Sequence, residues 1–264
     1  MSILTATILV GVIGLVCAAL LVVASHYMAV KVNETEVAVR ACLPGANCGA
    51  CGYSGCDGYA AALAADPTIA CNLCRPGGAD AAEKIAAALG VKAEAAEPVS
   101  AYVRCSGDCH ARGQICHYEG VQTCAAAKLL FGGGSACTFG CLGYGSCAAV
   151  CPNDAICIEN DIAHIDSRRC VGCGLCAKAC PNHIITLIPA KNQSVVTCSS
   201  QLKGPKVKAA CSAGCIACTK CAKNCPAGAI TIENNLARVD PEKCTGCGVC
   251  VENCPTGAIR AYEF

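Results

Sequence analysis

The sequence predicts an N-terminal transmembrane helix followed by small α+β modules whose folding depends on bound metal clusters. Three observations support this fold class. Residues 3–25 form an apolar run without a charged side chain. Cysteine accounts for 30 of the 264 residues, far above ordinary usage. Residues 124–180 align without a gap on residues 198–254, and nine of the ten cysteines in the first copy meet a cysteine in the second.

The apolar run at residues 3–25 is long enough to cross a bilayer. A cleaved signal peptide would carry a basic start and a shorter apolar stretch, and both are missing, so a retained anchor is favoured. The first positive charges are Lys31 and Arg40. The positive-inside rule therefore predicts a single span with the N-terminus outside and the cysteine-rich remainder in the cytoplasm, where thiols stay reduced.

Changes in composition divide the rest of the chain. We expect a transmembrane anchor at 1–30, an N-terminal 4Fe-4S domain at 31–78, a short helix and linker at 79–100, a first module with an upstream cysteine-rich insertion at 101–188, and a second module at 189–264. Each module has a hairpin pattern, at 155–165 and at 229–239, with apolar residues alternating on both arms. Modules this small bury little apolar surface, so bound clusters must hold their loops together.

The strongest chemical signal is a cysteine run that ends before a proline. It occurs twice, as Cys170, Cys173, Cys176, Cys180 and as Cys244, Cys247, Cys250, Cys254. Three cysteines spaced by two residues hold three corners of an iron–sulfur cube, and the fourth ligates the neighbouring cube in two-cluster ferredoxins. Zinc sites instead join two pairs across a longer gap, and cysteines this close form poor structural disulfides. The repeat therefore predicts two tandem bacterial dicluster-ferredoxin-like domains.

Crossing the fourth ligands between half-modules gives the ligand sets. In the second module they are Cys215, Cys218, Cys221, Cys254 and Cys244, Cys247, Cys250, Cys225. In the first module the downstream set is Cys170, Cys173, Cys176, Cys151. The upstream set is one ligand short because Tyr144 occupies the position equivalent to Cys218. Cys137 is the nearest replacement, which gives the set Cys137, Cys141, Cys147, Cys180.

A separate cysteine set precedes the repeat. Cys48, Cys51 and Cys56 stand among glycines, which leave room for a cube and free backbone N–H groups to hydrogen-bond sulfide. The fourth ligand is Cys74 or Cys71, and the tight Pro-Gly-Gly turn after Cys74 favours Cys74. Together with the modules, this set predicts five 4Fe-4S clusters.

Ten cysteines remain outside these sets: Cys17, Cys42, Cys71, Cys105, Cys109, Cys116, Cys124, Cys157, Cys198 and Cys211. Cys124 and Cys198 are equivalent in the repeat, as are Cys137 and Cys211, which indicates either an extra cluster or buried thiols beside one. Another candidate for a sixth centre is the widely spaced set Cys105, Cys109, Cys116, Cys124. The simpler interpretation is buried cysteine acting as a small apolar residue.

No nucleotide or catalytic site is expected. No Gly-rich phosphate loop follows a strand, and no Ser-His-Asp or Cys-His arrangement is present. We therefore expect no NAD site, no flavin site, no catalytic side chain and no nucleic-acid partner on this chain.

Five lysines crowd the second module: Lys203, Lys206, Lys208, Lys220 and Lys223. Such a cluster could offer an acidic redox protein a local positive face. An ordinary solvated surface is the alternative, and the sequence leaves both open.

The order of the motifs resembles one known family. An N-terminal span is followed by NCGACGYSGC with CRPGG, then by YVRCSG, FGGGSACTFGCLGYGSCAAVCP, VTCSSQLKGP and CSAGCIACTKCAKNCP. This pattern is similar to the iron–sulfur subunit designated B of the bacterial Rnf complex, in the longer form with two ferredoxin modules. The resemblance implies an inner-membrane subunit that accepts electrons from soluble reduced ferredoxin. It would relay them through 4Fe-4S clusters to the partner subunits, designated A, C, D, E and G, of an ion-pumping ferredoxin:NAD+ oxidoreductase.

Two features depart from the family pattern. Tyr144 breaks the ligand spacing, and four cysteines are additional: Cys71, Cys109, Cys116 and Cys157. The resemblance fixes neither the coupling ion, sodium or proton, nor the order and potentials of the clusters. The alternative function is an iron–sulfur scaffold or anchor of another membrane redox complex, since clusters also stabilise small folds.

Overall fold

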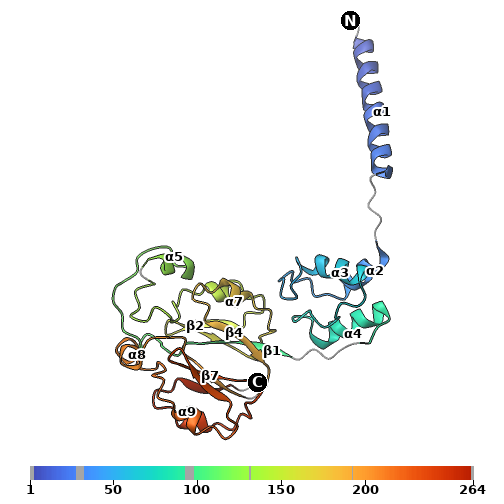
Figure 1. Cartoon of the computed structure of the whole chain (residues 1–264). Coiled ribbons are helices and arrows are strands. Elements are labelled where there is room, and N and C mark those ends of the chain that lie inside the picture. Colours follow the sequence, from blue (N-terminus) through green and yellow to red (C-terminus); the bar gives the residue numbers. More distant parts are fainter. Residues whose placement is uncertain (1–2, 28–32, 93–97, 131, 192, 263–264) are drawn as a thin grey trace.

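The computed structural model describes residues 3–27, 33–92, 98–130, 132–191 and 193–262. Helix α1 (Ile3–Tyr27) extends away from the remainder of the chain (Figure 1). Its segment Ile8–Ser25 is the one stretch of the described residues long and apolar enough to cross a membrane, and none of it is buried in the protein. Large apolar side chains such as Leu15 and Leu21 are more than 70% exposed, so this helix needs an apolar surrounding from outside the chain.

Three helices form the N-terminal unit: α2 (Glu34–Ala41), α3 (Cys56–Ala65) and α4 (Gly78–Leu89). The Asn33 side chain caps α2 by accepting from the Thr35 N–H, and Gly90 ends α4 in the left-handed conformation. Tyr59, Leu63 and Ile85 are fully buried between the helices. The Ala-rich helix expected near residue 79 is therefore part of this core, because Ile85 packs into it.

Each module contains the hairpin that the sequence predicts. Strand β2 (Ile156–Glu159) pairs with β3 (Ile162–Ile165), and β6 (Ile230–Glu233) pairs with β7 (Leu236–Val239), both antiparallel. Both turn residues have positive φ, 50° and 60° in either hairpin, which the Asn-Asp and Asn-Asn pairs tolerate. Four short helices lie in the loops that flank the hairpins, and each carries one cysteine. They are α6 (Ser146–Ala149), α7 (Leu175–Ala179), α9 (Lys220–Lys223) and α10 (Val249–Glu252).

Each module also has a second two-stranded sheet that joins its ends. Strand β1 (Val99–Val103) pairs with β4 (Ile185–Pro189), and β5 (Gln193–Val196) pairs with β8 (Ile259–Tyr262). Two further helices, α5 (Cys124–Leu129) and α8 (Gly204–Ala210), precede the first cysteine-rich loops. The fold is thus two small α+β modules in tandem, as the repeat predicts.

The two modules pack directly against each other. Tyr262 donates to the Ala101 carbonyl at 3.1 Å, and the Ser199 hydroxyl donates to the Phe139 carbonyl at 2.7 Å. The hydroxyls of Ser106 and Thr197 are hydrogen-bonded where both side chains are buried. Cysteines from both modules therefore lie along one shared junction.

Candidate metal-cluster sites

The downstream set of the second module lines one cavity. Cys225, Cys244, Cys247 and Cys250 surround a space of about 300 Å³ between β5 and the Cys225 turn. The Ala229 N–H donates to the Cys225 sulfur at 3.4 Å. The Ser194 hydroxyl of β5 hydrogen-bonds to Cys250. The structure thus brings together all four cysteines that the sequence grouped here.

The equivalent set of the first module also comes together. Burial raises the pKa of the Cys176 thiol to about 11, with the nearby thiols of Cys170, Cys173 and Cys151 adding to the effect. The Ala101 N–H donates to the Cys170 sulfur at 3.4 Å, and the Ala155 N–H donates to the Cys151 sulfur at 3.4 Å. Hydrogen bonds of this kind favour a negatively charged sulfur.

The upstream set of the second module follows the same pattern. Burial raises the pKa of Cys221 to about 11, with Cys215 and Cys218 close by. Burial also raises the pKa of Cys215, whose neighbours are Cys198 and Cys254. Cys218 is exposed, so one corner of this site reaches the protein surface.

The upstream set of the first module differs from the sequence expectation. Its cavity of about 340 Å³ is lined by Cys124, Cys141, Cys147 and Cys180, and Cys137 is not among the lining residues. Burial raises the pKa of Cys147 to about 12, with Cys141, Cys124 and Cys180 beside it. Cys124 lies at the start of α5, where its N–H donates to Ser146 at 2.9 Å.

The loop at Gly140 explains why Cys137 is displaced from this cavity. The Cys137 sulfur lies 3.7 Å, and the Cys105 sulfur 3.5 Å, from the position that a Cβ would take on Gly140. Cys137 therefore belongs with Cys105 on a second side of the loop, in a cavity that Cys198 and Cys211 also line. Sequence proximity to Cys141 was the only reason to choose Cys137, whereas Cys124 reaches the cavity through tertiary packing.

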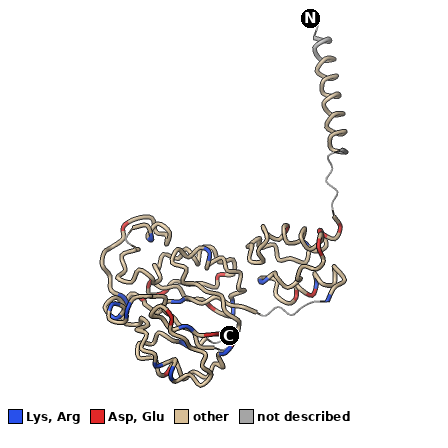
Figure 2. Tube along the Cα trace, in the orientation of Figure 1, with Lys and Arg blue, Asp and Glu red and all other residues tan. Residues whose placement is uncertain are grey.

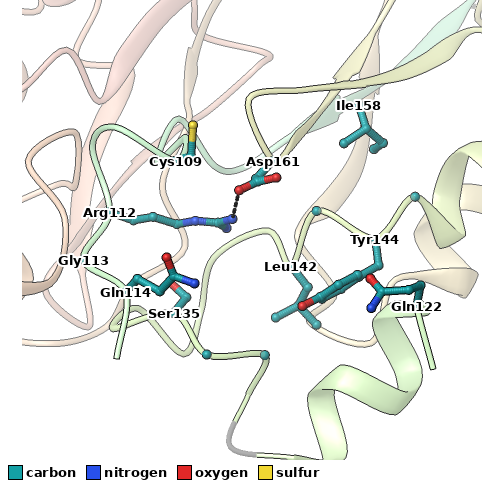
Figure 3. A pocket seen from close by; sticks show the side chains of 14 residues that line it. Cys109, Arg112, Gly113, Gln114, Gln122, Ser135, Leu142, Tyr144, Ile158 and Asp161 are labelled. Atoms are coloured by element: carbon teal, nitrogen blue, oxygen red, sulfur yellow. Dashed lines mark ion pairs between the residues drawn. The ribbon is translucent and has the colours of Figure 1, made fainter. Parts of the chain in front are cut away.

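Tyr144 occupies a different space from these cysteines. It lines a cavity with Arg112, Asp161 and Leu142, and the Arg112–Asp161 ion pair spans 3.5 Å (Figure 3). Its ring makes an edge contact with Tyr118, with ring centroids 5.4 Å apart. The Tyr144 side chain thus packs in this cavity and not among the cysteines, at the repeat position where the second module has Cys218.

The N-terminal set forms a compact group among the loops between α2 and α4. Burial raises the pKa of Cys74, and its neighbouring thiols are Cys56, Cys51 and Cys48. The Cys56 N–H donates to the Asn47 side chain at 2.9 Å. A Cβ on Gly77 would lie 3.2 Å from the Cys74 sulfur, so the glycine gives this thiol its room.

Cys71 lies in the core beneath the N-terminal group. It is 6% exposed and belongs to the cluster of buried side chains around Tyr59. Burial raises the pKa of Tyr59, and the Cys71 thiol adds to the effect. Cys74 is buried to the same degree in the same cluster, so the choice of Cys74 as fourth member rests on its neighbouring thiols Cys56, Cys51 and Cys48.

Four other cysteines lie outside the cavities that are lined by four cysteines. Cys42 is half-buried, and its thiol donates to the Ala38 carbonyl at 3.3 Å. Cys109, Cys116 and Cys157 are exposed. The widely spaced set that the sequence offered as a sixth centre is therefore not brought together, because Cys109 and Cys116 face solvent whereas its other two members line two different cavities.

The donor chemistry of the four-cysteine cavities fits a 4Fe-4S cluster. A zinc ion draws four ligands to one point, whereas a cube spreads them over four iron atoms. In the ranges that the structure describes, no three His, Cys, Asp or Glu side chains stand close enough to share a single ion. The cavities are instead lined by thiols that come from several loops, which suits a larger group.

The tandem modules and their four-thiol cavities define a ferredoxin-type iron–sulfur protein with a candidate membrane helix. The model of the 4Fe-4S binding domain family matches residues 163–186 and 237–260, and that of the putative Fe-S cluster family matches residues 43–76. These matches agree with 4Fe-4S clusters in the modules and an iron–sulfur site in the N-terminal unit.

Relatives extend the likeness over most of the chain, and each is the subunit designated B of its complex. That of the proton-translocating ferredoxin:NAD(+) oxidoreductase complex of Clostridium ljungdahlii is 46% identical over 88% of this chain and 82% of that protein. That of the Na(+)-translocating complex of Acetobacterium woodii is 40% identical over 89% and 71%. That of the ion-translocating oxidoreductase complex of Methanosarcina acetivorans is 39% identical over 88% of both. The chain belongs to this family of oxidoreductase subunits, as its motifs predict.

Proposed function

We propose that this chain is the membrane-anchored electron-transfer subunit of an ion-translocating ferredoxin:NAD+ oxidoreductase. It accepts electrons from reduced soluble ferredoxin and relays them to partner subunits. The activities for which two relatives are named support the reaction. The observation that carries the relay is the succession of four-thiol groups through the cysteine-rich part of the chain. A 4Fe-4S cluster, when bound, supplies one-electron oxidation and reduction.

Five ligand sets follow from these groups. They are Cys48, Cys51, Cys56, Cys74; Cys124, Cys141, Cys147, Cys180; Cys151, Cys170, Cys173, Cys176; Cys215, Cys218, Cys221, Cys254; and Cys225, Cys244, Cys247, Cys250. Cys124 takes the place that the sequence assigned to Cys137. Most of these cysteines are buried or half-buried, which limits the access of water, and backbone N–H groups stabilise charge on sulfur.

Electrons enter at the second module. Cys218 is exposed there, and Lys220 and Lys223 of α9 follow it directly in the chain. Both lysines are exposed and form no ion pair with any described residue. Figure 2 shows the lysines of α8 as a separate group from those of α9, so we assign the docking of an acidic ferredoxin to α9.

Electrons leave through the N-terminal unit. Burial raises the pKa of Cys173, and Cys48 is among the thiols close enough to add to the effect. The Lys178 ammonium lies 3.8 Å from the position that a Cβ would take on Gly49. The first module therefore contacts the unit that follows α1, which favours delivery toward the membrane.

The membrane helix sets the proposed location and partners. The chain lies at the bacterial inner membrane with a single span, the N-terminus outside and the cluster-bearing units in the cytoplasm. Support comes from the exposed apolar helix α1 and from Lys31 and Arg40, the first positive charges after it. The partners are the subunits designated A, C, D, E and G of the same complex, and the NAD and flavin sites lie on those partners.

Anaerobic turnover of the assembled complex tests the relay. Cys176→Ala removes a ligand between the junction and the N-terminal unit, and we expect it to abolish NAD+ reduction by ferredoxin. Cys157→Ala is the matched control, because Cys157 is exposed on β2 in the same module. Co-purification of the partner subunits checks assembly in both variants. Full turnover in an assembled Cys176→Ala complex would refute the relay and favour the scaffold function.

A further inference from the structure

We propose that this chain binds a sixth 4Fe-4S cluster at the junction of its two modules, held by Cys105, Cys137, Cys198 and Cys211. The four cysteines line one cavity. Cys105 and Cys137 come from the first module, and Cys198 and Cys211 come from the second. The cysteines share no spacing motif, so the site exists only through the packing of the modules.

The size of the cavity matches the other cluster sites. Its volume is about 340 Å³, the same as the cavity lined by Cys124 and close to the 300 Å³ cavity lined by Cys225. In each of the three cavities, four cysteines form part of the lining. The junction cavity therefore resembles the other two in both size and thiol content.

Small residues around the cavity let the thiols converge. A Cβ on Gly107 would lie 2.8 Å from the Cys211 sulfur and 3.9 Å from the Cys105 sulfur. A Cβ on Gly140 would lie within ordinary contact of the Cys105 and Cys137 sulfurs. The other lining residues are serines, Thr197, alanines, Gly214 and Val207, and none carries a charge. The site therefore offers sulfur ligands and room, without a competing ion pair.

Two of the four sulfurs have the kind of backbone hydrogen bond found at the other ligand sets. The Cys141 N–H donates to the Cys105 sulfur at 3.3 Å, and the Gly107 N–H also bonds to it. The Ala213 N–H bonds to Cys211. These match the backbone bonds to the Cys151 and Cys225 sulfurs, each 3.4 Å long.

The repeat explains where the extra ligands come from. Cys198 is the equivalent of Cys124. In the first module Cys124 fills the upstream site, because Tyr144 supplies no thiol there. In the second module Cys218 supplies the thiol at the upstream site, so Cys198 lines the junction cavity instead. One substitution thus accounts for the different uses of equivalent cysteines.

The cavity also lies between sites of the two modules. Gly140 lines both this cavity and the one that holds Cys141. On the other side, Cys198 belongs to the same cluster of buried side chains as Cys215. A cluster here would bridge the ligand sets of the first and second modules. This bridging role rests on the proposed function, whereas the binding of the cluster does not.

The test is iron and acid-labile sulfide per chain in the anaerobically purified complex, after subtraction of iron held by partner subunits in a preparation lacking this chain. We expect about 24 irons on the native chain, and about 20 would overturn the proposal, counting four per cluster. In Cys137→Ser/Cys211→Ser we expect about four irons and four sulfides to be lost, with the corresponding loss of intensity in the EPR spectrum of the reduced protein.

Cys109→Ser/Cys116→Ser is the control, because both cysteines are exposed and outside every cavity that four cysteines line. We expect it to keep all its iron. An unchanged iron content in Cys137→Ser/Cys211→Ser would also refute the site. If that variant loses more than four irons through misfolding, the count on the native chain decides. Failure of the relay would appear as lost turnover in a fully loaded complex, which iron analysis does not measure.

Discussion

Cys124 and Tyr144 together provide a ligand-exchange experiment. Cys124→Ser removes one of four thiols from the upstream cavity of the first module. We expect the loss of about one to four irons per chain, since three cysteines do not retain a complete cube. Cys157→Ser, which changes an exposed thiol of the same module, should leave the iron content unchanged.

Tyr144→Cys should then restore the site in the Cys124→Ser background. Tyr144 lies between Gly143 and Gly145, with φ of 80° and 72°, and Cys218 lies between Ala217 and Thr219, with φ of 54° and 63°. The two backbones therefore follow the same course, and a cysteine at 144 can point as Cys218 does. Loss of the ring contact with Tyr118 costs only about 1 kcal/mol, so the substitution should not unfold the module.

The assay is iron and sulfide per chain with EPR of the reduced protein. The expected series is full iron in the native chain, about one to four irons fewer in Cys124→Ser, and recovery in Cys124→Ser/Tyr144→Cys. Full iron content in Cys124→Ser would refute the ligand assignment. Loss without recovery would show that position 144 does not have the geometry of position 218.

Three further predictions concern docking, potential and folding. Lys220→Glu/Lys223→Glu should slow the reduction of the clusters by ferredoxin by about tenfold at low salt, and the difference should shrink as the salt concentration rises. Lys206→Glu/Lys208→Glu in α8 is the control. Stopped-flow rates of the native and α9 variants that are equal at every salt concentration would exclude α9 as the docking site. Ser194→Ala removes a hydroxyl hydrogen bond to Cys250 and should lower the reduction potential of the cluster held there. The potential is measured by EPR redox titration, with Thr231→Ala as the control. Identical titration curves for the two variants would contradict this role of Ser194. Removal of iron should unfold the modules before the α2–α4 unit, because that unit has its own helical core. Limited proteolysis with mass spectrometry follows the order of unfolding. Simultaneous cleavage of all three units would argue against separate stabilisation.

The sequence predicts those features that depend on local spacing. The apolar run of α1, the two hairpins and the ligand triplets with two-residue spacing are all readable because their partners are close in the chain. The family follows from the same motifs and is confirmed by relatives that cover most of the chain.

Long-range packing accounts for what the sequence did not reveal. Strand β1 pairs with β4 across the whole first module, and neither strand carries a turn signal that would link them. Cys124 reaches its cavity through α5, and the junction cavity draws on both modules. The equivalence of Cys124 with Cys198 was the available signal, but it did not indicate that the two would enter different sites.

The relay itself is tested most directly by mixing the anaerobic complex with reduced ferredoxin in the absence of NAD+ and recording EPR spectra after rapid freezing. The signal that is missing from a complex carrying Cys176→Ala identifies the cluster of the Cys151, Cys170, Cys173, Cys176 set. The proposed relay predicts that 4Fe-4S signals of this subunit appear on the timescale of turnover. If ferredoxin reduces none of them, the clusters serve a structural purpose and the relay is contradicted.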